Sequence, residues 1–149
     1  MNVVIIDYGA GNIQSIRFAL ARLGITAALS DDISIIKNAS HVIFPGVGEA
    51  SSAMEKLRAT KLDKLLPTLT QPVLGICLGM QLMCNHTEEG NTQGLGIFDT
   101  AVVRFETNLN VPHMGWNTVE GKGILFGNID ANRCCLLYTS DAADDLRGV

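Results

Sequence analysis

The chain lacks a long apolar run, the pattern typical of a secretory leader and any cluster of basic residues. Its most apolar stretch, residues 71–78 with their flanks, falls far below the roughly 20 residues that a membrane-spanning helix needs. The amino terminus has neither a cationic start nor a cleavage site, so we expect a cytoplasmic protein. The formal charge is −4 and no basic patch could hold a phosphate backbone, so neither nucleic acid nor a membrane is an expected partner.

Cysteines are few, and they are not spaced for zinc or for disulfide bonds. The chain has Cys77, Cys84, Cys134 and Cys135, without a paired C-x-x-C frame. We therefore expect reduced thiols and no metal site. With 149 residues, of which 47% are apolar, the chain can bury one continuous core and is too short to suggest two independent domains.

What the chain does have is an alternation of short apolar strands and helices. The pattern predicts strands at 2–7, 26–29, 41–44 and 72–76, and helices at 13–23, at 51–69 with a break near Thr60, and from Cys77 to about His86. Such alternation predicts a parallel sheet covered on both faces, with a ligand site at the carboxyl ends of its strands. Segments 96–105 and 114–119 are predicted to add antiparallel strands to this sheet.

The strongest chemical signal is a cysteine between two glycines at a predicted strand-to-helix turn, Gly75-Ile76-Cys77-Leu78-Gly79. Such an elbow strains the backbone at the nucleophile, and its neighbours two positions away must lack a β-carbon. Unpaired amides at the start of a helix favour the thiolate. The alternative is a small cysteine buried between strand and helix, which is the preferred interpretation of Cys84.

The segment from Gly75 to Gln81 resembles the nucleophile motif of class I, triad-type glutamine amidotransferases, and Pro45-Gly46-Val47-Gly48 resembles their oxyanion strand. The resemblance implies that the thiolate attacks the glutamine carboxamide while backbone amides stabilise the oxyanion. It assigns these roles to Cys77 as nucleophile and to Val47, Gly48 and Leu78 as oxyanion donors.

The same resemblance implies a glutamine-binding site formed by Gly46, Gln81 and Glu89, with Glu89 pairing with the α-ammonium group of the substrate. From the residues alone, the ordinary interpretations are different. Gln81 could be a solvated helix residue, and Glu88 and Glu89 could form an exposed acidic turn.

Two further segments narrow the resemblance. Pro112-His-Met-Gly-Trp-Asn117 resembles the signature of the glutaminase subunit of imidazole glycerol phosphate synthase, and Asp7-Tyr-Gly-Ala-Gly-Asn12 agrees with it. This family implies L-glutamine hydrolysis for histidine biosynthesis, no cofactor, and a heterodimer with a TIM-barrel cyclase subunit that receives the ammonia. Asn12 and Trp116 are candidates for the partner-facing side. The alternatives are that Asn12 belongs to an ordinary exposed glycine turn and that Trp116 lies in the core.

The general base that a thiolate mechanism needs is not found in this chain. None of His41, His86 and His113 matches the catalytic histidine of the family, and its glutamate partner is also absent. We therefore expect the chain as given to be nearly inactive. The resemblance covers Met1 to about Asn132.

After Cys134 the sequence changes character. Residues 135–149 are similar to a translated transposase sequencing adapter, and the alternative is the frayed terminus of a real protein. The expected organisation is a partial glutamine amidotransferase domain at 1–134 and a non-native tail at 135–149. The expected fold is a three-layer, flavodoxin-like α/β sandwich with a mainly parallel sheet, cut off before its last strands.

Two other classes of function compete with this interpretation. Gly9-Ala10-Gly11 follows a strand, and Asp31 or Asp32 could contact a ribose, but Gln14 stands where a dinucleotide-binding loop has its third glycine. A redox sensor would oxidise the elbow thiol instead of acylating it. An electrophilic glutamine analogue distinguishes the sensor from an amidotransferase.

Overall fold

The central sheet has four parallel strands. The computed structural model describes residues 1–106, 108, 114–118, 134–138 and 145–146. The strands of the sheet are β1 Val3–Ile6, β2 Ala27–Ser30, β3 His41–Phe44 and β4 Val73–Gly75. They pair in the order β2-β1-β3-β4, and every pairing is parallel. The predicted strands and the parallel sheet are confirmed.

Helices connect these strands, and most lie where the sequence predicts them. They are α1 Ile13–Arg22, α2 Ile33–Lys37, α3 Ala50–Ala59, α4 Leu62–Leu65 and α5 Leu78–Leu82, with short 3-10 turns η1 Leu66–Thr68 and η2 Glu89–Asn91. The predicted break near Thr60 is confirmed, since Lys61 has a φ of 60° and separates α3 from α4. The helix α2 was not predicted. Among the described residues, no helix has the length and apolar character to cross a membrane.

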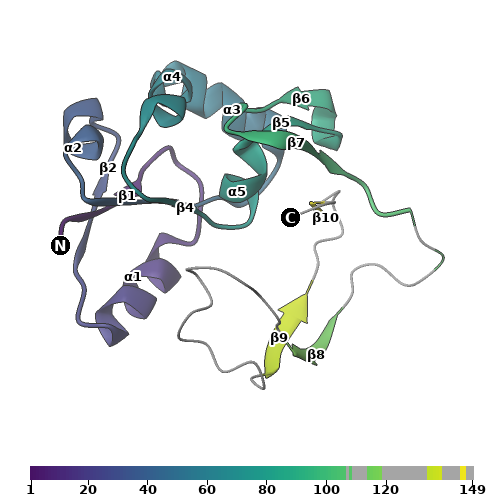
Figure 1. The fold of residues 1–149 in the computed structure, drawn as a ribbon, viewed down its shortest axis with the longest axis horizontal. Coiled ribbons are helices and arrows are strands. Elements are labelled where there is room, and N and C mark those ends of the chain that lie inside the picture. Colours follow the sequence, from purple (N-terminus) through teal and green to yellow (C-terminus); the bar gives the residue numbers. More distant parts are fainter. Residues whose placement is uncertain (107, 109–113, 119–133, 139–144, 147–149) are drawn as a thin grey trace.

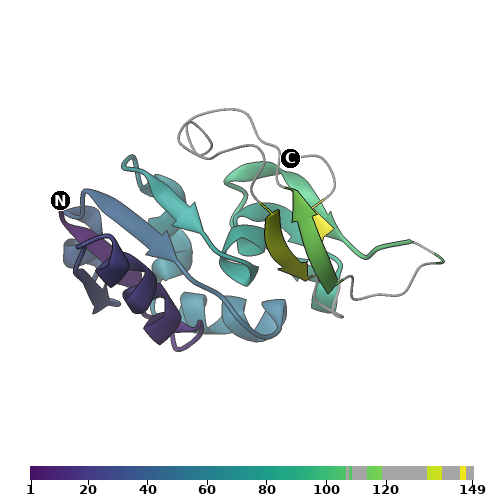
Figure 2. The same ribbon diagram turned by 90° about the horizontal axis from the view of Figure 1, so that it is seen from below.

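The two faces of the sheet are packed by different helices (Figures 1 and 2). Val4, Ile6, Val42 and Phe44 point to a large buried cluster with residues of α2, α3, α4 and α5. The alternate strand residues Val3, Ile5 and Ile43 point to the other face, where they form a smaller cluster with residues of α1. This alternation is the period-2 pattern of strands buried on both faces. The three-layer α/β sandwich is therefore confirmed.

The prediction that the helix after Cys77 runs to about His86 is wrong, because α5 ends at Leu82 and β5 follows at Cys84–Thr87. The carbonyl oxygens of Leu82 and Met83 accept hydrogen bonds from the amides of Leu95 and Ile97, both at 2.8 Å. A longer helix would need these carbonyls for its own next turn. Pairing with a distant segment therefore overrides the helical pattern.

The segments after Gly90 do not extend the central sheet as predicted. A second sheet has the order β10-β7-β5-β6, where β6 is Thr92–Gln93, β7 is Phe98–Val103 and β10 is Asp145–Leu146. In it, β7 pairs parallel with β5. The strand β8 Met114–Thr118 pairs antiparallel with β9 Cys134–Tyr138 in a separate two-stranded sheet. Figures 1 and 2 place β5 and β7 beyond α5, away from the central strands.

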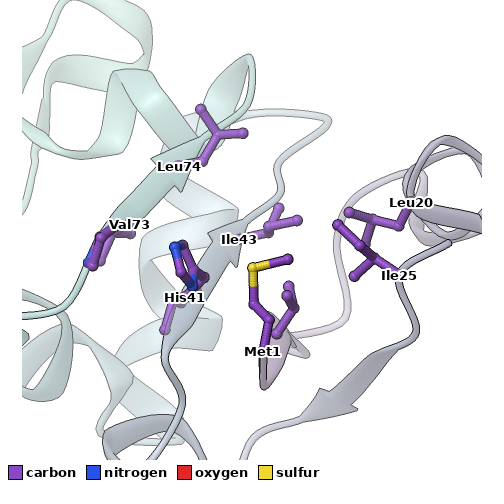
Figure 3. Close-up of a pocket in the computed structure, with 10 residues that line it drawn as sticks. Met1, Leu20, Ile25, His41, Ile43, Val73 and Leu74 are labelled. Atoms are coloured by element: carbon purple, nitrogen blue, oxygen red, sulfur yellow. The ribbon is translucent and has the colours of Figure 1, made fainter. Parts of the chain in front are cut away.

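An apolar hollow lies on the α1 side of the central sheet (Figure 3). It has a volume of about 340 Å³ and is lined from β1, α1, β3 and β4, with Met1, Leu20, Ile43 and Leu74 among the lining residues. Leu74 is 46% exposed although it lies on a sheet strand. The helix α1 therefore covers only part of this face.

We predict that Leu74→Gln weakens the binding of an apolar fluorescent dye to the chain by about threefold, because it removes exposed apolar surface from the hollow. A dye titration followed by fluorescence measures this change. The matched control is Ile35→Gln, which replaces an exposed apolar residue on α2 that does not line the hollow. Equal losses in both variants would show that the dye does not bind in the hollow.

Candidate active site

Cys77 forms the elbow that the sequence predicts. It follows β4, caps the start of α5, and has a φ of 51° and a ψ of −121°. A non-glycine residue rarely adopts a positive φ, and this one costs free energy. The amides of Met80 and Gln81 donate to the carbonyl oxygen of Cys77 at 2.9 and 3.1 Å. These hydrogen bonds connect the strained turn to the first turn of α5. Cys77 is exposed.

The two glycines around the elbow are required by close backbone packing. A β-carbon on Gly75 would lie 2.6 Å from the α-carbon of Met80. A β-carbon on Gly79 would lie 2.9 Å from the carbonyl oxygen of Pro45 and would overlap that of Phe44. The flanking glycines therefore have the steric role that the motif predicts, and Gly79 brings α5 directly onto the end of β3.

The loop Pro45 to Gly48 lies against the first residues of α5. A β-carbon on Gly46 would lie 2.8 Å from the carbonyl carbon of Leu78 and would overlap the amide nitrogen of Gly79. The amide of Ile76 also donates to the carbonyl oxygen of Phe44 at 3.0 Å. The structure thus brings the elbow and the glycine loop together at the carboxyl ends of β3 and β4.

Tyr8 is a residue of this site that the sequence interpretation missed. Its hydroxyl donates a hydrogen bond of 2.8 Å to the carbonyl oxygen of Pro45, and its ring centre lies 5.5 Å from that of Phe44. Burial raises the pKa of Tyr8 well above its usual value, and the charge of Cys77 raises it further. The signal in the sequence was an aromatic residue with a polar tip two residues after the carboxyl end of β1.

The candidate substrate residues Gln81 and Glu89 differ in their surroundings. Gln81 lies on α5 and is only 4% exposed, so it is not the solvated helix residue of the alternative interpretation. The carboxylate of Glu89 accepts a hydrogen bond of 3.1 Å from the amide of Ala50, two residues beyond Gly48. Glu89 therefore stabilises the start of α3, where a negative charge is favourable. This contact holds its carboxylate close to the end of the glycine loop.

The candidate partner-facing residues are both exposed. The side chain of Asn12 caps α1 by accepting from the amide of Ser15 at 3.2 Å. Gly11, beside it, packs against Pro45, since a β-carbon there would lie 2.7 Å from the β-carbon of Pro45. Trp116 lies on β8 and is 72% exposed, so the alternative of a core tryptophan is wrong.

The described histidines belong to other parts of the fold. His41 begins β3, at the end of the strand opposite to the glycine loop, and it lines the apolar hollow. His86 lies within β5 and is paired with Gln93 and Ala101. His113 lies outside the described residues. In the part of the chain that the structure describes, no three His, Cys, Asp or Glu residues are grouped to hold a metal ion.

Asp32 caps α2. Its carboxylate accepts hydrogen bonds from the amides of Ser34 and Ile35 at 2.7 and 3.1 Å. Hydrogen bonding from the Ser34 hydroxyl and from these amides lowers the pKa of Asp32. The carboxylate considered for a ribose thus has a local structural role, and Gln14 lies within α1 where the third glycine of a dinucleotide loop would be.

Comparison with known families agrees with this geometry. Residues 4–138 match the family model described as glutamine amidotransferase class-I. The chain therefore belongs to the class I glutamine amidotransferase family, and the resemblance of its motifs is confirmed. A crystal structure of a glutamine amidotransferase shares the fold with a TM-score of 0.65 and 20% identity, over 78% of this chain and 64% of that one. A putative GMP synthase component from Thermoplasma acidophilum has a TM-score of 0.58 and 18% identity, over 88% and 60% of the two chains.

Several curated proteins that resemble this chain are HisH subunits of imidazole glycerol phosphate synthase. The imidazole glycerol phosphate synthase subunit HisH of Bacteroides thetaiotaomicron is 54% identical over 122 residues, which are 80% of this chain and 62% of that protein. The subunit HisH of Idiomarina loihiensis is 48% identical over 121 residues, with coverage of 80% and 62%. That of Haemophilus influenzae is 46% identical over 121 residues, with coverage of 80% and 61%. The chain thus spans somewhat more than three fifths of the length of these relatives.

Proposed function

We propose that this chain is part of the glutaminase subunit of an imidazole glycerol phosphate synthase, in which Cys77 hydrolyses L-glutamine and releases ammonia. The observation that carries the proposal is the strained, exposed Cys77 beside the loop Pro45 to Gly48. The identity of 54% to a HisH subunit supports the choice among amidotransferases. In this proposal the ammonia is used by a TIM-barrel cyclase partner in a cytoplasmic heterodimer for histidine biosynthesis.

The proposed reaction begins when the Cys77 thiolate adds to the γ-carboxamide carbon of glutamine. The carbonyl electron pair moves onto oxygen, where the amides of Val47, Gly48 and Leu78 stabilise it. Its return expels the nitrogen as ammonia after protonation and leaves a γ-glutamyl thioester on the sulfur. Water hydrolyses the thioester to glutamate and restores the thiol.

The other proposed site residues bind the substrate. Gly46 contributes to the glutamine site from the glycine loop, Gln81 lines the site from α5, and Glu89 pairs with the α-ammonium group. The proton transfers need a general base. None of the three histidines of the chain matches the catalytic histidine of the family, so none is assigned this role. The 149-residue chain itself is therefore proposed to turn over glutamine very slowly.

The exposed Asn12 and Trp116 are proposed to face the cyclase partner. Residues 135–149 are proposed to be translated adapter, not part of the domain at 1–134. Sequencing the source DNA with a different library chemistry tests it, and the same 15 codons in that read would refute it.

We predict that the electrophilic glutamine analogue 6-diazo-5-oxo-L-norleucine labels Cys77 covalently and that L-glutamine slows this labelling. Peptide mapping by mass spectrometry locates the label. Cys84 is the internal control, because it is fully buried and burial raises the pKa of its thiol. Labelling that glutamine does not slow, or oxidation of Cys77 by peroxide with no labelling by the analogue, would contradict the proposal and favour the redox sensor.

A further inference from the structure

We infer that Tyr8 is a positioning residue for the glycine loop Pro45 to Gly48, acting through the hydrogen bond from its hydroxyl to the Pro45 carbonyl oxygen. The inference rests on the proposed function, since it assigns this loop to oxyanion stabilisation. It extends that function by a residue outside the motifs, whose hydroxyl donates to the backbone at the start of the loop.

The bond restrains the start of the loop because a peptide unit is planar. Fixing the carbonyl of Pro45 fixes the whole Pro45–Gly46 peptide plane, from which the chain continues to the proposed donor amides of Val47 and Gly48. Gly46 and Gly48 have permissive backbones, and Gly48 adopts a φ of 92°. A loop of this composition does not hold one orientation by its own preferences, and an external anchor removes that freedom.

The anchor is itself held firmly. Tyr8 is buried, its ring packs against Phe44, and its hydrogen bond to Pro45 is also buried. In the same segment, Gly11 packs against the side chain of Pro45. The segment after β1 thus contacts Pro45 at two points, one polar and one steric.

The hydroxyl remains a donor under the conditions in which the elbow thiol reacts. Burial, aided by the charge of Cys77, raises the pKa of Tyr8 well above its usual value. The hydroxyl therefore stays protonated while a thiolate forms, and the hydrogen bond to Pro45 persists when the site carries a negative charge.

The test compares two reactions of the same thiolate in the full chain and in its Tyr8→Phe variant, each followed at several pH values. With p-nitrophenyl acetate, the thiolate adds to the carbonyl carbon, an oxyanion forms, and its collapse expels p-nitrophenolate and leaves an acetyl thioester. With iodoacetamide, the thiolate displaces iodide from carbon and no oxyanion forms. The first rate depends on the oxyanion donors, and the second depends only on the thiolate.

We expect Tyr8→Phe to lower the acylation rate of Cys77 by about 3- to 10-fold, the range for one hydrogen bond, and to leave its alkylation rate unchanged. Hydrogen exchange followed by mass spectrometry should show faster exchange of the amides at 46–48. Thr68→Val is the matched control, since it also removes a hydroxyl that donates to a backbone carbonyl, at 2.7 Å, but at the opposite end of β4. It should change neither rate nor the exchange of the loop.

Each result decides between named possibilities. Equal losses of acylation and alkylation, or no loss of acylation, would overturn the positioning role. If the unaltered chain is not acylated at Cys77, the proposed nucleophile fails, and the exchange measurement still decides whether Tyr8 anchors the loop. Exchange at 46–48 that is the same in Tyr8→Phe and in the unaltered chain would overturn the anchor by itself.

Discussion

Replacing Gly79 with alanine should destabilise the fold by about 3 kcal/mol, the upper end of the cost of overpacking. The added β-carbon would overlap the carbonyl oxygen of Phe44 and lie 2.9 Å from that of Pro45. Both are backbone atoms at the end of β3, so no side chain can rotate away. The free energy of unfolding from denaturant titration measures the loss.

Gly24→Ala is the control for this prediction. Gly24 has a φ of 70°, and no heavy atom lies within 4 Å of a β-carbon built there. Its replacement should cost only the conformational penalty of about 1 kcal/mol. Equal losses at Gly79 and Gly24 would show that contact between α5 and β3 is not what requires glycine in the elbow.

The strand order explains why distant motifs meet at one site. In the central sheet β3 lies between β1 and β4, and all three strands run in the same direction. Their carboxyl ends therefore present three consecutive turns side by side: the segment from Tyr8 to Asn12, the loop from Pro45 to Gly48, and the elbow at Cys77. The hydrogen bond from Tyr8 and the packing of Gly46 join the three turns into one unit.

The sequence was sufficient to predict the parts of this site that depend on local chemistry. The apolar runs predicted the central strands, and the two glycines around Cys77 predicted the elbow, because these features need only short-range geometry. The same reasoning failed at the end of α5. There the carbonyls of Leu82 and Met83 are used by Leu95 and Ile97, and a contact between such distant residues leaves no periodic pattern in the sequence.

Two hydrogen bonds of the site could not be predicted from the sequence, because each joins residues that are far apart along the chain. The bond from Tyr8 to Pro45 joins residues 37 positions apart, and that from Ala50 to Glu89 joins residues 39 positions apart. The motifs pointed to candidate residues near Cys77 but not to the contacts that hold them in place. Glu89 shows the difference, since the sequence suggested a substrate contact and the structure adds a role in capping α3.

Cys77→Gly should stabilise the chain by about 1 to 3 kcal/mol, because it removes the cost of placing a side chain at a φ of 51° and a ψ of −121°. Glycine adopts this conformation readily. The same substitution should abolish labelling by the glutamine analogue, because it removes the sulfur. Thermal and denaturant unfolding measure the first effect, and mass spectrometry measures the second.

Cys77→Ala separates the two effects. Alanine also lacks the thiol but keeps a β-carbon in the strained conformation, so labelling should be lost without the gain in stability. If alanine and glycine raise the free energy of unfolding equally, the strain assigned to the elbow is absent, and the gain comes from removing the thiol. If glycine alone raises the free energy of unfolding, the strained backbone that holds the sulfur outward at the carboxyl end of β4 destabilises the fold. A cost of that kind is expected where the conformation of the backbone serves the reaction and not the packing.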